Sequence, residues 1–152
     1  MSYVDRVLQP GEHVVARGRL HWVVYAGGVF AFLAAIIIAI GAYQAPGVRL
    51  AIQILALLLA LFGVALLVRA WWHRWGLEIA VTNRRVIYKT GVIRRRTLEM
   101  NLEQIESVQV DQSILGRLLG YGDISVHGTG EGLEVIRLIA DPISVRNAVT
   151  AR

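Results

Sequence analysis

The residues best suited to binding chemistry form a basic group in the second half of the chain. No acidic residue occurs between Ile79 and Leu98. Six basic residues occupy thirteen positions of this segment, namely Arg84, Arg85, Lys89, Arg94, Arg95 and Arg96. Beside a leaflet rich in anionic lipid, each would contribute about 1 kcal/mol of attraction. We therefore predict a lipid or partner surface here, although a solvated strand face that protects a sheet edge has the same composition.

The acidic residues that follow this group do not indicate acid–base catalysis. Four acids occur without an intervening basic residue, namely Glu99, Glu103, Glu106 and Asp111. A catalytic carboxylate pair needs a cleft and two different environments, and this spacing supports neither. We predict instead that these acids pair internally with the arginines.

Metal and cofactor sites are not expected either. The chain has no cysteine, which excludes disulfides and thiolate zinc sites. Its four histidines lack the i, i+4 spacing of a helical metal pair. The glycine-rich stretch at 128–132 lacks the Gly-Lys-Ser/Thr of a phosphate-binding loop and is predicted to be a turn. We therefore predict no catalytic residue, no metal and no cofactor, and a protein that is not an enzyme.

Two long apolar runs must position any such surface. They cover residues 22–43 and 50–70 and are joined by a turn at 44–49. Each reaches the roughly 20 residues that a helix needs to cross a bilayer. A cleaved signal peptide does not fit, because 21 residues of mixed charge precede the first run and the run is too long. We predict a transmembrane hairpin.

The charges that flank the runs predict the orientation of this hairpin. Three arginines precede the first run and several basic residues follow the second, whereas the connecting turn carries only Arg49. Because basic residues are retained on the cytoplasmic side, both termini are predicted to be cytoplasmic in a multi-pass protein.

Small residues recur every fourth position along both runs. They are Gly27, Ala31, Ala35 and Ala39 in the first run, and Ala56 and Ala60 in the second. Such a seam lets helices approach closely in lipid. It is predicted to join the two runs to each other, and it could instead join two protomers or dock a larger membrane protein.

The flanking segments are predicted to be rich in strands. Residues 12–18 alternate like a short strand that could join the C-terminal sheet, and a flexible juxtamembrane tail is the alternative. After residue 74, strands are expected at 77–82, 85–89, 92–100, 105–111, 123–128 and 133–140, with a short helix at 113–119 and a terminal helix through about 150. We expect Ile114, Leu115, Leu118 and Leu119 of the short helix to dock against the sheet.

The whole chain resembles the membrane-flanked bacterial PH-like (pleckstrin-homology-like) domain family. The likeness is carried by Pro10-Gly11-Glu12 and His21-Trp22, by VTNRRVIYKTGVIRRR at 81–96, by the run at 102–130, and by Asp141-Pro142. The resemblance implies an α+β membrane protein with a transmembrane hairpin, then a PH-like antiparallel β-roll or barrel with a C-terminal helix. It also implies the bacterial inner membrane and no established reaction.

Together these features predict a binding or scaffolding module tethered to the membrane. Its partners would be membrane lipids and a membrane protein or a second copy of the chain. An accessory subunit that docks on a larger complex through the hairpin is the alternative. Nucleic acid is not expected despite a pI near 10.2, since eleven basic and nine acidic residues leave only +2 between Arg74 and Arg152.

Overall fold

The computed structural model describes residues 3–44, 46–92, 96–129 and 133–151. The chain forms two compact units, which are considered separately below. Unit 1 combines Met1–His21 with Arg74–Arg152, and unit 2 is Trp22–His73. Segments from both ends of the sequence therefore build unit 1.

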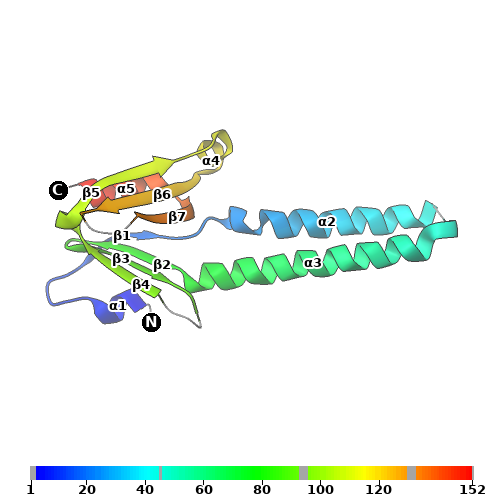
Figure 1. The fold of residues 1–152 in the computed structure, drawn as a ribbon, viewed down its shortest axis with the longest axis horizontal. Coiled ribbons are helices and arrows are strands. Elements are labelled where there is room, and N and C mark those ends of the chain that lie inside the picture. Colours follow the sequence, from blue (N-terminus) through cyan, green and yellow to red (C-terminus); the bar gives the residue numbers. More distant parts are fainter. Residues whose placement is uncertain (1–2, 45, 93–95, 130–132, 152) are drawn as a thin grey trace. The chain divides into compact units, whose positions relative to one another are not determined.

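Unit 2 is a pair of long apolar helices (Figure 1). Its elements are η1 (Trp22–Tyr25), α2 (Ala26–Gly41), η2 (Ala42–Gln44), η3 (Pro46–Val48) and α3 (Arg49–Gly76), of which α3 continues into unit 1. The two candidate spans run over Trp22–Gln44 and Pro46–Gly76. In each, only 11% of the most apolar window is buried, which distinguishes them from the core helices of a soluble protein. Both are long and apolar enough to cross a membrane.

The described residues of unit 1 form seven antiparallel strands in two sheets (Figure 1). The first sheet has the order β1-β2-β3-β4, and the second has the order β5-β6-β7. The strands are β1 (Val14–Gly18), β2 (Glu78–Thr82), β3 (Arg85–Thr90), β4 (Arg96–Asn101), β5 (Ile105–Asp111), β6 (Tyr121–Gly128) and β7 (Leu133–Ala140). The helical elements are α1 (Tyr3–Val7), η4 (Leu102–Gln104), α4 (Ile114–Leu119) and α5 (Pro142–Thr150). The N-terminal segment is therefore a strand of the sheet, paired with β2, and not a free tail.

The two sheets join where β1 continues past its last paired residue. The amide of Ala140 donates to the carbonyl of Arg19 at 2.9 Å, and the amide of His21 donates to the carbonyl of Leu138 at 2.7 Å. Leu20 bridges to Ile139 between them. One chain segment thus makes backbone contacts with both antiparallel sheets.

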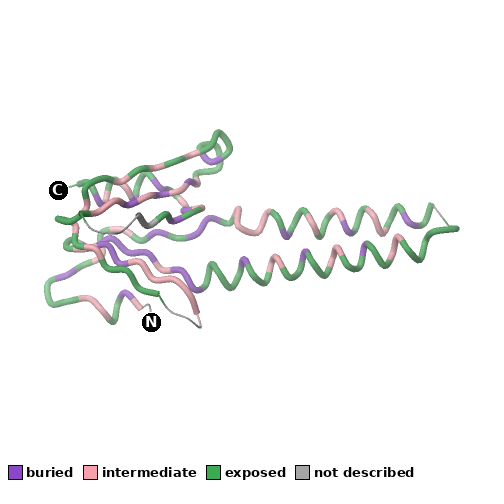
Figure 2. The backbone as a smooth tube through the Cα atoms, in the orientation of Figure 1, coloured by how far each residue is buried: buried purple, intermediate pink, exposed green. Residues whose placement is uncertain are grey.

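The core lies between the sheets and α5. It contains Ile79 and Val81 from β2, Ile124 and Ile136 from the second sheet, and Val149 from α5. Figure 2 shows β2 as mostly buried, whereas buried and partly buried positions alternate along β6. Helix α5 begins where expected, because the carboxylate of Asp141 accepts from the amide of Ser144 and Pro142 fills the first turn. A second cluster covers the other face of the first sheet, where Val4 of α1 packs with Ala80 and Ile87.

Unit 1 has two distinct ends. One carries His21 and Arg74, the residues at which the chain passes into unit 2, and we call it the helix-connected end. The turn after β3 lies there too, since a Cβ added to Gly76 would lie 2.9 Å from the Val92 side chain. The opposite end carries the turn between β2 and β3. We use these two ends to locate each candidate residue.

The prediction for helix α4 was wrong. Its side chains were expected to dock against the sheet, but Ile114, Leu115 and Leu118 are 89%, 62% and 80% exposed. Only Gly116 is buried, where a Cβ would lie 2.6 Å from the carbonyl oxygen of Tyr121. Because glycine is the residue that faces the module, the backbone of α4 packs closely and its apolar side chains point outward.

Candidate functional site

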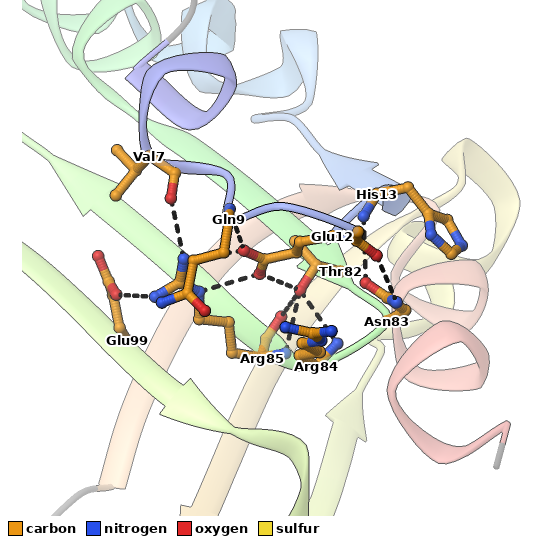
Figure 3. Close-up of polar contacts among 10 residues, drawn as sticks. Val7, Gln9, Glu12, His13, Thr82, Asn83, Arg84, Arg85 and Glu99 are labelled. Atoms are coloured by element: carbon orange, nitrogen blue, oxygen red, sulfur yellow. Dashed lines mark hydrogen bonds and ion pairs between the residues drawn. The ribbon is translucent and has the colours of Figure 1, made fainter.

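A hydrogen-bonded network in unit 1 is built around Arg85 and Glu12 (Figure 3). Nε of Arg85 donates to Oε1 of Glu12 at 2.9 Å, and Nη2 donates to Oε2 at 2.9 Å. The carboxylate of Glu99 accepts from Nη1 at 2.7 Å. Glu12 also accepts from the Thr82 hydroxyl at 2.8 Å and from the Gln9 amide at 2.9 Å. Arg85 and its partners therefore form a network that satisfies its own charges.

The network is buried, so its charged groups serve to hold unit 1 together. The side chains of Glu12 and Arg85 are 1% and 13% exposed. The hydrogen bonds from Arg85 lower the pKa of Glu12 from 4.5 to about 2, against the opposing effect of burial. The Glu12 carboxylate in turn raises the pKa of Arg85. Both groups therefore stay ionised, and Arg85 presents little free charge to a lipid or a partner.

Of the six residues of the predicted basic surface, the four that the structure describes do not form one group. Arg84 lies in the turn before β3, at the end opposite the helix-connected end. Nζ of Lys89 lies 3.8 Å from the carboxylate of Glu78. Arg96 is exposed at the start of β4, close to the helix-connected end. Strand β3 separates the two turns by about 17 Å. Arg94 and Arg95 lie outside the described residues.

A second set of arginines gathers at the helix-connected end. Arg17, Arg19 and Arg74 line a pocket of about 260 Å³ together with Glu78 of β2. Arg17 pairs with Asp5 of α1, and both side chains are roughly half exposed. Arg19 is exposed, and its backbone is fixed by the bond to Ala140. The sequence signal for this set is the closeness of the three arginines to the apolar runs.

The close packing inside unit 2 follows a seven-residue spacing. Its buried positions in the described part of the hairpin are Gly28, Ala35 and Ala42 in the first helical segment and Ala56, Gly63 and Ala70 in the second. Seven residues are about two helical turns, so small residues meet at regular intervals. Of the expected seam, Ala35 and Ala56 are buried, Ala31, Ala39 and Ala60 are partly buried, and Gly27 is exposed with open space at its Cβ position.

Four alanines of that seam, Ala35, Ala39, Ala56 and Ala60, border a groove on one side of the hairpin. Its volume is about 360 Å³. It is lined by Phe32, Ala35, Ile36, Ala39, Gln53, Ala56, Leu57 and Ala60. The alanines leave space between larger neighbours, and Gln53 adds the one side-chain amide of the groove. Such a groove has a shape that a further helix can fill.

Potential metal ligands do not cluster in the part of the chain that the structure describes. No group of three or more His, Cys, Asp or Glu side chains is placed to hold an ion there. His21 instead packs its ring against Tyr121, with the ring centroids 5.2 Å apart. This contact joins the end of β1 to the start of β6.

Two antiparallel sheets closed by a C-terminal helix, with two long apolar helices inserted after the first strand, define a PH-like module attached to a helical hairpin. The chain belongs to the bacterial PH domain family, whose model matches residues 22–151. That match covers the hairpin as well as most of the β-rich unit. No curated protein and no solved structure matches the chain.

Proposed function

We propose that this protein is a nonenzymatic PH-like binding module, anchored in the bacterial inner membrane by its hairpin, with both termini in the cytoplasm. Its helix-connected end would bind anionic lipid headgroups. One observation carries this proposal. Arg17, Arg19 and Arg74 line one pocket; Arg19 stands three residues before the first apolar helix, and Arg74 lies in the last turn of the second.

The composition of the two helices supports the anchor. Most of their large apolar side chains are exposed in unit 2, which would be unfavourable in water. Trp22 and Trp71 are 54% and 51% exposed at the ends that lead into unit 1. Tryptophan is enriched at the headgroup level of membranes, so these residues fit an interfacial position.

Chain connectivity supports the lipid ligand. Arg19 stands only three residues before Trp22, so chain connectivity limits how far its backbone can lie from the start of the first apolar helix. An anionic leaflet attracts basic residues within about a Debye length of its surface, roughly 8 Å at physiological ionic strength. Arg19 and Arg96 are both exposed, and they would add to this attraction.

Tryptophan fluorescence tests this function on the full chain. The chain is reconstituted in phosphatidylcholine vesicles with a small fraction of either brominated phosphatidylglycerol or brominated phosphatidylcholine. Bromine quenches nearby tryptophans, so enrichment of the anionic lipid should give stronger quenching by brominated phosphatidylglycerol. The difference should shrink in the Arg19→Ala/Arg96→Ala variant and at high salt. Equal quenching by the two lipids would overturn the proposal.

The matched control is Arg84→Ala. Arg84 is exposed and basic, but it lies at the opposite end of unit 1. Its substitution removes one positive charge, as Arg19→Ala alone does, and should leave the lipid preference unchanged. A loss of lipid preference equal to that of Arg19→Ala alone would mean that overall charge, not the helix-connected end, attracts the lipid.

The groove in the hairpin favours a second candidate function. An accessory subunit would use it to receive a transmembrane helix of a larger protein. A photoreactive residue at Gln53, which lines the groove, should then crosslink to a partner protein in native membranes. Ile37 is 70% exposed and does not line the groove, so it serves as the control position. Crosslinks from both positions alike, or from neither, would count against this role.

A further inference from the structure

Helix α4 carries the most exposed apolar side chains of the β-rich unit. Among the residues of unit 1 that the structure describes, Ile114 and Leu118 are the two large apolar side chains with the highest exposure, at 89% and 80%, and Leu115 is 62% exposed. Leu119 adds a fourth at 40%. At 100° per residue, these four positions cover one continuous face of the helix. A contiguous aliphatic face of this kind marks a contact surface.

The helix is held firmly in this orientation. The hydroxyl of Ser113 caps it by accepting from the amide of Gly116 at 3.0 Å. It ends at Gly120, whose φ of 78° is left-handed. The side-chain amide of Gln112 donates to the carbonyl of Tyr121 at 3.0 Å. The apolar face therefore points outward because the backbone of α4 is anchored, and not because the helix lacks contacts.

Two further hydrogen bonds locate α4 at the helix-connected end. The carbonyl of Gly120 accepts from the amide of Asp141 at 2.9 Å. The adjacent Ala140 donates to the carbonyl of Arg19. Tyr121, which follows Gly120, packs against the ring of His21. The first apolar helix begins at the next residue, Trp22. These contacts place α4 at the end of unit 1 from which the chain leaves for the hairpin.

We propose that α4 inserts its apolar face into the headgroup and acyl boundary of the membrane that the hairpin crosses. The contact would be a second, shallow anchor that holds unit 1 against the leaflet. Arg117, in the last turn of α4, is exposed and can reach headgroup phosphates while its aliphatic stem stays in the boundary. This inference rests on the proposed membrane anchor, but it does not require anionic lipid.

The absence of cysteine from the chain permits a direct test. Single variants Ile114→Cys and Leu118→Cys of the full chain are labelled with an environment-sensitive fluorophore and reconstituted in neutral phosphatidylcholine vesicles at low protein density. Glu103→Cys in η4 is the control, because η4 bonds to Thr129 beyond the far end of β6 and Glu103 is exposed. Circular dichroism of each variant checks that the fold is kept.

Insertion predicts a blue-shifted emission at positions 114 and 118. Quenching by nitroxide-labelled lipid should be strong there, and quenching by aqueous iodide should be several-fold weaker than at position 103. Equal iodide quenching at all three positions would overturn the proposal. Shielding from iodide without quenching by the labelled lipid would also overturn it, because a protein or a second copy of the chain would then cover α4.

The outcomes separate this inference from headgroup binding. Insertion of α4 in neutral vesicles together with equal quenching by the two brominated lipids would support the shallow anchor and reject the anionic ligand. A preference for brominated phosphatidylglycerol with α4 exposed to iodide would do the reverse. If the full chain fails to float with vesicles, the hairpin anchor and this inference both fail.

Discussion

Arg85 and Glu12, 73 positions apart in the sequence, form a two-point ion pair with both hydrogen bonds at 2.9 Å. Glu12 precedes β1 and Arg85 begins β3, so the pair ties the N-terminal segment to the sheet built after the hairpin. The pair thereby links the two segments of unit 1 that precede and follow the hairpin in the sequence.

Removing one partner of this pair should destabilise unit 1. Glu12→Gln would leave a largely buried guanidinium with only Glu99 as a charged partner, at an expected cost of about 3 kcal/mol. The loss would appear as a lower midpoint of thermal unfolding for the full chain in mild detergent. Asp5→Asn is the matched control, because the Asp5 pair with Arg17 is exposed and should contribute less than about 1 kcal/mol. Equal effects of the two substitutions would contradict this ranking.

The same pair predicts a pH dependence with a definite sign. The pKa of Glu12 falls from 4.5 to about 2 on folding, so the unfolded chain binds the proton more tightly. The contribution of Glu12 is therefore fully present above pH 4.5 and is lost as the pH falls toward 2. The difference in unfolding midpoint between the native chain and Glu12→Gln should narrow over this window. A difference that stays constant from pH 6 down to about 2 would show that the pKa of Glu12 is not lowered on folding.

Deletion of residues 1–18 should disrupt unit 1. The deletion removes β1, leaves β2 with an unpaired edge, and removes Glu12 from Arg85. We expect loss of the cooperative thermal transition and rapid proteolysis of the β-rich unit. Val15→Ala is the control, since Val15 lies in β1 but is 53% exposed. An unchanged transition after deletion would restore the alternative of a dispensable tail.

The adjacent residues Gly27 and Gly28 allow a test of which positions pack between the two helices of the hairpin. A Cβ at Gly28 would lie 2.7 Å from the Leu67 side chain, and one at Gly63 would lie 3.0 Å from the backbone nitrogen of Phe32. Gly27 has open space at the same position. Gly28→Leu and Gly63→Leu should therefore force the helices apart at a cost of about 1 to 3 kcal/mol, whereas Gly27→Leu should be tolerated.

Unfolding of the reconstituted hairpin by sodium dodecyl sulfate, followed by helical circular dichroism, measures these costs. The Gly28 and Gly63 variants should unfold at lower detergent fractions than the native chain. If Gly27→Leu were equally sensitive, the four-residue seam would describe the packing better than the seven-residue spacing.

Local patterns were sufficient for most of the secondary structure. The two apolar runs are helical because twenty consecutive apolar residues leave few other ways to satisfy the backbone. The strands after α3 follow from alternation and turn residues, and α5 follows from Asp141 and Pro142. Boundaries moved where local signals were weak. Helix α3 continues to Gly76, six residues past Ala70, and β6 begins at Tyr121 instead of Asp123.

The partners of the charged residues and the packing positions of the hairpin depend on the tertiary structure. A sequence does not show which charged side chains meet in the fold. Only the structure shows that Glu12 and Glu99 pair with Arg85. It also shows that Arg19 lines the pocket at the helix-connected end. The spacing of the hairpin seam depends on which faces of the two helices meet. In the structure Gly28 and Gly63 lie in close contact with the opposite helix, and Gly27 does not.

The sequence by itself determined the class of the protein, because long apolar runs and strand alternation are properties of local stretches. The direction of the apolar face of α4, in contrast, was not determined by the sequence. Its composition suits a buried helix as well as an interfacial one, and only the backbone contact of Gly116 with Tyr121 turned Ile114 and Leu118 outward. A pattern shows that a helix has an apolar face, but the tertiary contacts decide what that face meets.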